Sequence, residues 1–278
     1  MKYLELSIDV IPREPWNEIF ISDLSELGFE SFQEDEDGCL KAYIQETNYK
    51  ESDVTNLFNQ RRIQIDFTHK ILLLEEQNWN AEWESQFEPV LVDDKLEIIA
   101  PFHNSLLKQG LSIVIEPKMT FGTGHHQTTY LICSFLLNFP LKNLVVLDMG
   151  TGTGVLAILT ELLGARMIKA VEIEEWSVEN AIENVQRNNC SRIEVIEGSK
   201  EQIPTIQFDL ILANINKNVL RDQFSSYSIH TKAGGSLLIS GFFTTDDNEL
   251  ILTANENDFQ FISSKEKDGW SMLQFIKR

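Results

Sequence analysis

The sequence predicts an α/β protein in which a seven-stranded, doubly wound sheet follows a small α+β ferredoxin-like domain. Three observations support this fold class. From about residue 143 onward, apolar strand-like runs alternate with helix-like stretches, and the first run leads into three alternating glycines. Residues 1 to about 75 instead show the order strand, helix, two strands, helix, strand. Strands that alternate with helices form a parallel sheet with helices on both faces.

The elements of the large domain follow from this alternation. Strands are predicted at 145–148, 168–173, 193–197, 208–213 and 236–241, and helices at 155–163, 176–188, 219–230 and 247–257. Two further strands, 260–265 and 270–276, flank the turn Asp268-Gly269 and are expected to add one antiparallel strand. Such sheets bind ligands at the carboxyl ends of the strands, near the topological switch point. The glycine turn after the first strand is therefore the expected ligand site.

The small domain is predicted from strand-like runs and two helix-like stretches. Strands are expected at Tyr3–Val10, Cys39–Gln45 and Arg62–Phe67, and helices at Trp16–Leu27 and Ser52–Gln60. The order of elements is typical of a ferredoxin-like sandwich.

A polar segment with regularly spaced aromatic residues separates the two domains. Trp79, Trp83 and Phe87 are four residues apart, so a helix would carry all three on one face. We expect this face to pack against one of the flanking domains. The predicted organisation is a first domain at 1–74, a linker helix at 75–90 and a second domain at 91–278.

The charge balance indicates which kinds of binding partner to expect. The formal charge is −20, from 23 Lys and Arg residues against 43 Asp and Glu residues. Binding to the phosphate backbone of nucleic acids depends on clustered Lys and Arg, so we expect no direct nucleic-acid contact. Small molecules or basic proteins are favoured as partners. The alternative is that the acidic residues only keep the protein soluble.

The remaining composition indicates a cytoplasmic protein without a membrane segment or a metal. The N-terminus alternates apolar and polar residues, unlike a signal peptide, and no apolar run reaches spanning length. Cys39, Cys133 and Cys190 are few, odd in number and far apart, which favours reduced thiols without a catalytic role. The adjacent His125 and His126 have no carboxylate or cysteine at ligand spacing, so no metal site is expected.

The stretch Val145–Gly154, VVLDMGTGTG, carries the main functional signal. Its alternating glycines, Gly150 and Gly152 among them, indicate a backbone that turns sharply or approaches a ligand closely. A G-x-G-x-x-A pattern starts at Gly152, and Glu172 follows about twenty residues later, as in a dinucleotide site. Asp148 and the additional glycine extend the motif to D-x-G-x-G-x-G, which favours the amino-acid part of S-adenosylmethionine as the ligand.

Two residues at later strand ends have side chains suited to a methyl-transfer site. Glu172 is expected to accept hydrogen bonds from both hydroxyls of an adenosine ribose. Asn214 ends an apolar strand, and its amide oxygen is expected to orient an amine by accepting its protons. Methyl transfer is an in-line displacement that needs a neutral amine, and a desolvated pocket beside a sulfonium favours that form.

A second glycine-containing block, Thr120–Thr129 (TFGTGHHQTT), precedes an apolar helix predicted at Tyr130–Leu137. Its glycines permit a mobile lid. We expect Thr128 or Thr129 to cap the helix and to direct a hydroxyl toward a ligand.

With FGTGHHQTT, LDMGTGTG, VEIE and LANIN in this order, the chain resembles the PrmA-type methyltransferases, which modify large-subunit ribosomal protein eleven. The resemblance implies a class I, Rossmann-like methyltransferase that uses S-adenosylmethionine to trimethylate lysines and the N-terminal amine of that protein. The motif match gives cofactor-binding positions to Thr129, Gly150, Glu172 and Asn214, with Asn214 also facing the target amine. The N-terminal domain would then grip the free substrate protein.

The interpretation is therefore a cytoplasmic protein-lysine N-methyltransferase that binds S-adenosylmethionine over Asp148–Gly154 and Glu172. Three alternatives stay open. The same fold could act on another protein or on a small amine, the glycine turn could serve an NAD-dependent oxidoreductase, or the chain could be a ribosome-associated binding module without turnover.

Overall fold

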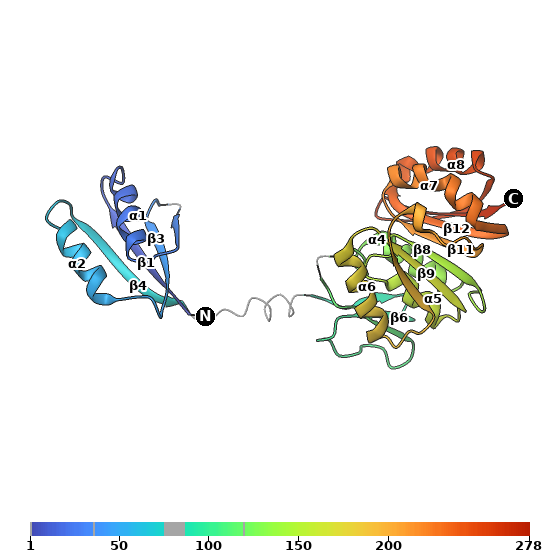
Figure 1. Ribbon diagram of the computed structural model, residues 1–278, viewed down its shortest axis with the longest axis horizontal. Helices are drawn as coiled ribbons and strands as arrows, with labels where there is room; N and C mark the ends of the chain where they lie inside the picture. Colours follow the sequence, from blue (N-terminus) through green and yellow to red (C-terminus); the bar gives the residue numbers. More distant parts are fainter. Residues whose placement is uncertain (1, 36, 75–86, 119) are drawn as a thin grey trace. The chain divides into compact units, whose positions relative to one another are not determined.

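The computed structural model describes residues 2–35, 37–74, 87–118 and 120–278. The chain forms two compact units, Met1–Gln86 and Phe87–Arg278, and each has a hydrophobic core of its own (Figure 1). Most of the expected linker helix falls on residues 75–86, which lie outside the described residues. Within the described ranges, no helix combines the length and apolar character needed to cross a membrane.

The small unit has the predicted ferredoxin-like topology. Its elements are β1 (Tyr3–Val10), α1 (Trp16–Glu26), β2 (Ser31–Glu34), β3 (Leu40–Gln45), α2 (Glu51–Arg61) and β4 (Phe67–Leu74). The strands form one antiparallel sheet in the order β2-β3-β1-β4. Alternate residues of β1 are buried with apolar residues of both helices, because period-two side chains share one face of a sheet.

One predicted strand of this unit is wrong. The alternation of Ile63, Ile65 and Phe67 predicts a strand from Arg62, but Arg62–Gln64 form a turn after α2, and β4 begins only at Phe67. The backbone N–H groups of Gln64 and Ile65 donate to the carbonyl of Arg61 at 2.8 and 3.0 Å. Ile63 is 86% exposed whereas Ile65 packs against the core, so these alternating apolar residues do not share one buried face.

The large unit contains the predicted seven-stranded sheet. Its strands are β8 (Val145–Met149), β9 (Met167–Glu172), β10 (Ile193–Glu197), β11 (Phe208–Asn214), β12 (Thr231–Phe243), β13 (Phe259–Lys267) and β14 (Trp270–Lys277). The order in the sheet is β10-β9-β8-β11-β12-β14-β13. All neighbours are parallel except for β14, which is antiparallel to β12 and β13 and follows the turn at Asp268-Gly269.

Helices cover both faces of this sheet (Figure 1). The helices are α4 (Gln127–Leu136), α5 (Val155–Leu162), α6 (Glu175–Arg187), α7 (Lys217–His230) and α8 (Asp247–Glu256), with short 3-10 turns at Lys200–Gln202 and Thr244–Asp246. Apolar residues of α4, α5 and α6 share a core with one set of strand residues, and those of α7 and α8 share a core with the alternate set. Both faces of the central strands are therefore buried, as their near-continuous apolar runs require.

A smaller sheet was not predicted. β5 (Val90–Val92), β6 (Leu96–Ile99) and β7 (Leu111–Val114) form a three-stranded sheet that packs into the core of the large unit. β5 and β6 are antiparallel, whereas β6 and β7 are parallel. Val90, the last residue of the expected linker helix, is the first residue of β5.

The topology places two turns side by side. The chain leaves β8 toward β9 and β10 and then returns to β11 on the other side of β8, so the switch point lies between β8 and β11. The glycine turn follows β8, and Asn214 is the last residue of β11. The two sequence motifs therefore meet at the same edge of the sheet, where ligands of such folds bind.

Candidate functional site

A cavity of about 780 Å³ lies at this edge. Its lining comes from the glycine turn, the ends of β9 and β11, the segment before α4 and the start of β14. Five of the predicted site residues line the cavity: Thr129, Gly150, Gly152, Glu172 and Asn214. Its size and apolar lining suit a ligand of nucleoside dimensions.

The glycine turn accepts no side chain at two of its positions. Gly150 and Gly152 have φ angles of +70° and +55°. A Cβ on Gly150 would lie 2.3 Å from Cγ2 of Ile215, and one on Gly152 would lie 2.3 Å from the carbonyl oxygen of Phe121. Glycine is therefore required at both positions for two reasons: the backbone is left-handed, and the neighbouring segments lie too close for a side chain.

Asp148 is buried behind the glycine turn and stabilises it through hydrogen bonds. It is 1% exposed and does not line the cavity. Its Oδ2 accepts hydrogen bonds from Thr151 Oγ1 at 2.6 Å and Ala157 N at 3.1 Å, and its Oδ1 has no partner among the described residues. Burial raises the pKa of Asp148 to about 6, and the charge of Glu172 acts in the same direction. The predicted ligand contact of Asp148 stays a prediction.

Glu172 joins two turns at the cavity wall. Its Oε2 accepts a hydrogen bond from Gly152 N at 2.9 Å, and its Oε1 accepts from Ile173 N at 2.9 Å and Glu174 N at 3.3 Å. A carboxylate has about four acceptor positions, so capacity for a ligand hydroxyl is left. The side chain thus fixes the glycine turn as well as lining the cavity.

Asn214 and Thr129, which both line the cavity, are joined by a hydrogen bond. Asn214 Nδ2 donates to Thr129 Oγ1 at 3.4 Å, which fixes the orientation of the amide. The amide Oδ1 is buried and has no hydrogen-bond partner in the described part of the chain. A buried acceptor without a partner is costly, so this oxygen is suited to a ligand donor.

The helix cap predicted at Thr128 or Thr129 is wrong. α4 begins at Gln127, and His126 is its N-cap, whose Nδ1 accepts from Thr128 N at 3.3 Å. Both threonines therefore lie in the first helical turn, where Thr129 still reaches the cavity. The neighbouring His125 contacts the Glu88 carbonyl oxygen and Thr123 Oγ1. No three His, Cys, Asp or Glu side chains in the described ranges gather closely enough to hold a metal ion.

Sequence reasoning missed an aromatic part of the cavity wall. Phe121, His126 and Trp270 all line the cavity, although β14 is far from the other two in sequence. The ring of His126 lies 5.1 Å from that of Phe121 and 4.5 Å from that of Trp270. Burial in this wall lowers the pKa of His126, which favours the neutral imidazole. Only the fold brings these rings together, so no local motif signals them.

Comparison with known proteins shows which family the chain belongs to. A family model described as ribosomal protein L11 methyltransferase (PrmA) matches residues 18–278. The chain belongs to this family. It is 38% identical over 279 residues to the ribosomal protein L11 methyltransferase of Bacteroides thetaiotaomicron, with 99% of each chain covered. It is 37% identical over 284 residues to that of Porphyromonas gingivalis, with 99% of this chain and 98% of that one covered.

A solved structure supports the same assignment. The ribosomal protein L11 methylase of Lactobacillus delbrueckii subsp. bulgaricus matches with a TM-score of 0.64 and 28% identity, over 69% of this chain and 100% of that chain. The chain is a methyltransferase, and its methyl donor is S-adenosylmethionine. The predicted methyltransferase fold and cofactor are thus confirmed, and the NAD-dependent alternative is wrong.

The geometry of the cavity fits this cofactor. Gly150 and Gly152 line the cavity and let the turn pack directly against Ile215 and the Phe121 carbonyl, where a Cβ would clash. Glu172 and Asn214, which also line the cavity, carry hydrogen-bond acceptors. A cation with ribose hydroxyls and an amino-acid end requires acceptors of this kind.

Proposed function

We propose that this chain methylates lysine side chains and the N-terminal amine of ribosomal protein L11, with Asn214 orienting the acceptor amine. The observation that carries the proposal is that Asn214 lines the cavity and that its buried Oδ1 has no hydrogen-bond partner among the described residues. An amine nitrogen that donates to this oxygen keeps its lone pair free for the methyl carbon. The family's name gives ribosomal protein L11 as the methyl acceptor.

The cofactor-binding roles are proposed for the residues around the glycine turn. Glu172 would accept the ribose hydroxyls, the turn at Gly150 and Gly152 would hold the amino-acid end, and Thr129 would fix the amide of Asn214. Asp148 would act through the turn, since it bonds to Thr151 and Ala157 beneath it.

The reaction needs positioning and desolvation rather than a strong base. S-adenosylmethionine supplies an electrophilic methyl group with a neutral thioether as leaving group. The amine lone pair forms the new C–N bond as the C–S bond breaks, and a proton leaves the amine. A lysine with an ordinary pKa of about 10.4 is cationic at neutral pH, so the apolar wall around Phe121 and Trp270 assists by disfavouring the charged amine.

The small unit is proposed to bind the substrate protein before its assembly into a ribosome. It is a separate compact unit with its own core, and it contains none of the residues that line the cavity in the large unit. We expect residues 87–278 alone to bind cofactor with the affinity of the full chain, and to transfer methyl groups to ribosomal protein L11 far more slowly. Equal rates for the two proteins would exclude this role.

The function is tested with purified ribosomal protein L11, S-adenosylmethionine and mass spectrometry of the products. We expect methyl additions to free L11, mapped to lysines and the N-terminus, and slower addition to assembled large ribosomal subunits. Asn214→Ala should lower kcat much more than cofactor affinity, because the amide is proposed to act on the amine. An unmodified L11, with methyl transfer to another protein, would instead favour a different substrate for the same site.

A further inference from the structure

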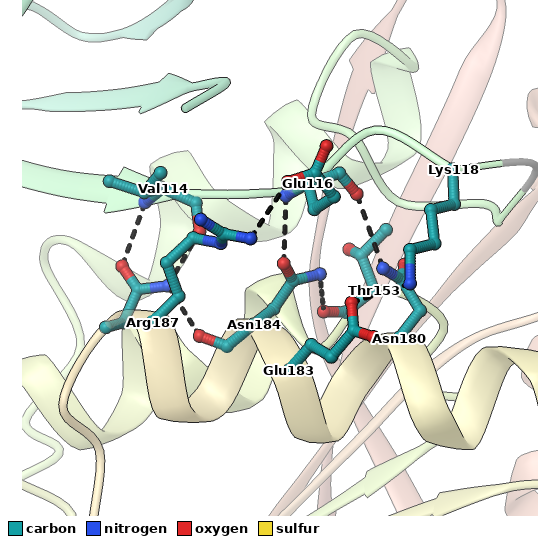
Figure 2. Close-up of polar contacts among 9 residues, drawn as sticks. Val114, Glu116, Lys118, Thr153, Asn180, Glu183, Asn184 and Arg187 are labelled. Atoms are coloured by element: carbon teal, nitrogen blue, oxygen red, sulfur yellow. Dashed lines mark hydrogen bonds and ion pairs between the residues drawn. The ribbon is translucent and has the colours of Figure 1, made fainter. Parts of the chain in front are cut away.

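Asn180 and Asn184 of α6 (Figure 2), together with its C-cap residue Asn188, bond the end of β7 and the extended segment that follows it. Asn180, Asn184 and Asn188 are four residues apart, so their side chains point the same way. Asn188 accepts from Val114 N at 2.8 Å and donates to Val114 O at 2.7 Å, as a neighbouring strand would. Asn180 donates to the carbonyl of Glu116 at 3.4 Å. A row of side-chain amides therefore provides hydrogen-bond partners for the backbone of the extended segment.

The segment is bonded along both of its edges. Val114 and Glu116 face α6, while Ile115 N donates to the carbonyl of Ile99 in β6 at 2.8 Å. This alternation is the normal hydrogen-bonding pattern of a strand. Two ion pairs, Lys118 with Glu183 and Arg187 with Glu116, add contacts at the surface. Exposed ion pairs contribute little to stability. The hydrogen bonds of the asparagine amides therefore provide most of the stabilising contact between the segment and the helix.

Asn184 differs from the other two asparagines because it also contacts the glycine turn. Its Oδ1 accepts from Glu116 N at 2.8 Å, and its Nδ2 donates to the carbonyl of Thr153 at 2.9 Å (Figure 2). Both Asn184 and Thr153 are fully buried. The amide of Asn184 thus bonds the extended segment through its oxygen and the glycine turn through its nitrogen.

Thr153 continues the connection to the segment above the turn. Its backbone N–H donates to the carbonyl of Phe121 at 3.1 Å, and its hydroxyl donates to the carbonyl of Gly122 at 2.6 Å. Phe121 and Gly122 line the cavity. A continuous series of hydrogen bonds therefore runs from Glu116 through Asn184 and Thr153 to the cavity wall.

We propose that Asn184 is a positioning residue for cofactor binding. It holds the Thr153 carbonyl, and with it sets the glycine turn and the Phe121–Gly122 wall at the spacing that the cofactor requires. The inference rests on the assignment of this cavity to S-adenosylmethionine. It predicts that a helix residue outside the cavity lining controls affinity for the cofactor.

The test compares Asn184→Ala with Asn188→Ala in the full chain. Both variants remove hydrogen bonds from the same helix face and the same extended segment, but only Asn184→Ala removes a bond to the turn. We expect Asn184→Ala to weaken binding of S-adenosylhomocysteine, measured by calorimetry, about ten-fold or more. Asn188→Ala should lower the melting temperature and leave the affinity within about two-fold of the parent.

A double-mutant cycle separates positioning from general loosening of the fold. Thr153→Val removes only the hydroxyl bond to Gly122 and should weaken binding about five-fold. The effects of Asn184→Ala and Thr153→Val should be non-additive, because both act through the same turn, whereas those of Asn188→Ala and Thr153→Val should add. If Asn184→Ala does not fold, Asn184→Asp takes its place: this variant keeps the acceptor for Glu116 N and loses the bond to the Thr153 carbonyl, and parental affinity in it overturns the proposal.

Two further outcomes also overturn the proposal. One is parental affinity in folded Asn184→Ala, and the other is an equal loss of affinity in Asn188→Ala. A parent chain that binds no S-adenosylhomocysteine would instead refute the assignment of the cavity, which distinguishes the two failures.

Discussion

Asp148→Asn replaces a buried carboxylate whose ionisation opposes folding. The folded chain raises the pKa of Asp148 from 3.8 to about 6, chiefly through burial. A raised pKa means that the folded state binds the proton more tightly than the unfolded state does. The resulting cost is absent below about pH 4, grows as the pH rises toward 6, and is complete above that. At pH 8 it amounts to about 3 kcal/mol of unfolding free energy.

The substitution keeps the shape of the side chain and removes this dependence. The amide oxygen can still accept from Thr151 and Ala157, while the amide NH2 takes the place of the unpartnered oxygen. An unpartnered NH2 has a cost of about 1–3 kcal/mol that does not vary with pH. The difference between variant and parent should therefore shift in favour of the variant by about 1–2 kcal/mol between pH 5 and pH 8.

Urea denaturation without cofactor at pH 5 and pH 8 measures this shift. Asp209→Asn is the matched control. Burial alone would raise the pKa of Asp209, but hydrogen bonds from Lys232 and from Val145 N lower it below the ordinary value. Stability contributed by a lowered pKa is lost only as the pH falls through that value, so the Asp209→Asn difference should be flat from pH 5 to pH 8. A flat difference for Asp148→Asn would refute the reasoning.

Two further substitutions test the cavity. Glu172→Ala should weaken cofactor binding by about 1.5–3 kcal/mol by calorimetry, since hydrogen bonds to a charged group are lost, while the exposed Glu175→Ala outside the cavity should leave it unchanged. Gly152→Ala should destabilise the chain by about 1–2 kcal/mol from its left-handed backbone alone and also weaken cofactor binding, because the new Cβ meets the Phe121 carbonyl. Parental melting temperature and affinity in Gly152→Ala would contradict the close contact at the turn.

Local patterns predicted the parts of the fold that depend on neighbours in sequence. The apolar run ending in Asp148 and the strand ending in Asn214 are buried on both faces, so their composition alone indicates central parallel strands. The strands of the small sheet are only three or four residues long and include Glu97. This carboxylate is fully buried because Ser105 and two backbone N–H groups donate to it, and no local pattern indicates such a partner set.

The sequence also predicted those parts of the candidate site that lie close together along the chain. Glycines with positive φ and the acid at the end of β9 appear as a motif, because the turn needs them in sequence. Trp270 and Phe121 meet only in the folded chain. Asn180, Asn184 and the C-cap residue Asn188 do leave a signal, a spacing of four residues, but polar residues at that spacing are also typical of a solvated helix face.

The position of β14 between β12 and β13 constrains the order in which the sheet is completed. Among the described residues, β13 pairs with β14 alone, so it has no place in the sheet until β14 has paired with β12. The turn at Asp268-Gly269 makes the β13–β14 pairing local, whereas the pairing of β14 with β12 spans a longer stretch of chain. Local contacts form with less loss of chain entropy. We therefore expect the hairpin to form early and to dock as a unit through β14, which delivers Trp270 to the cavity in the same step.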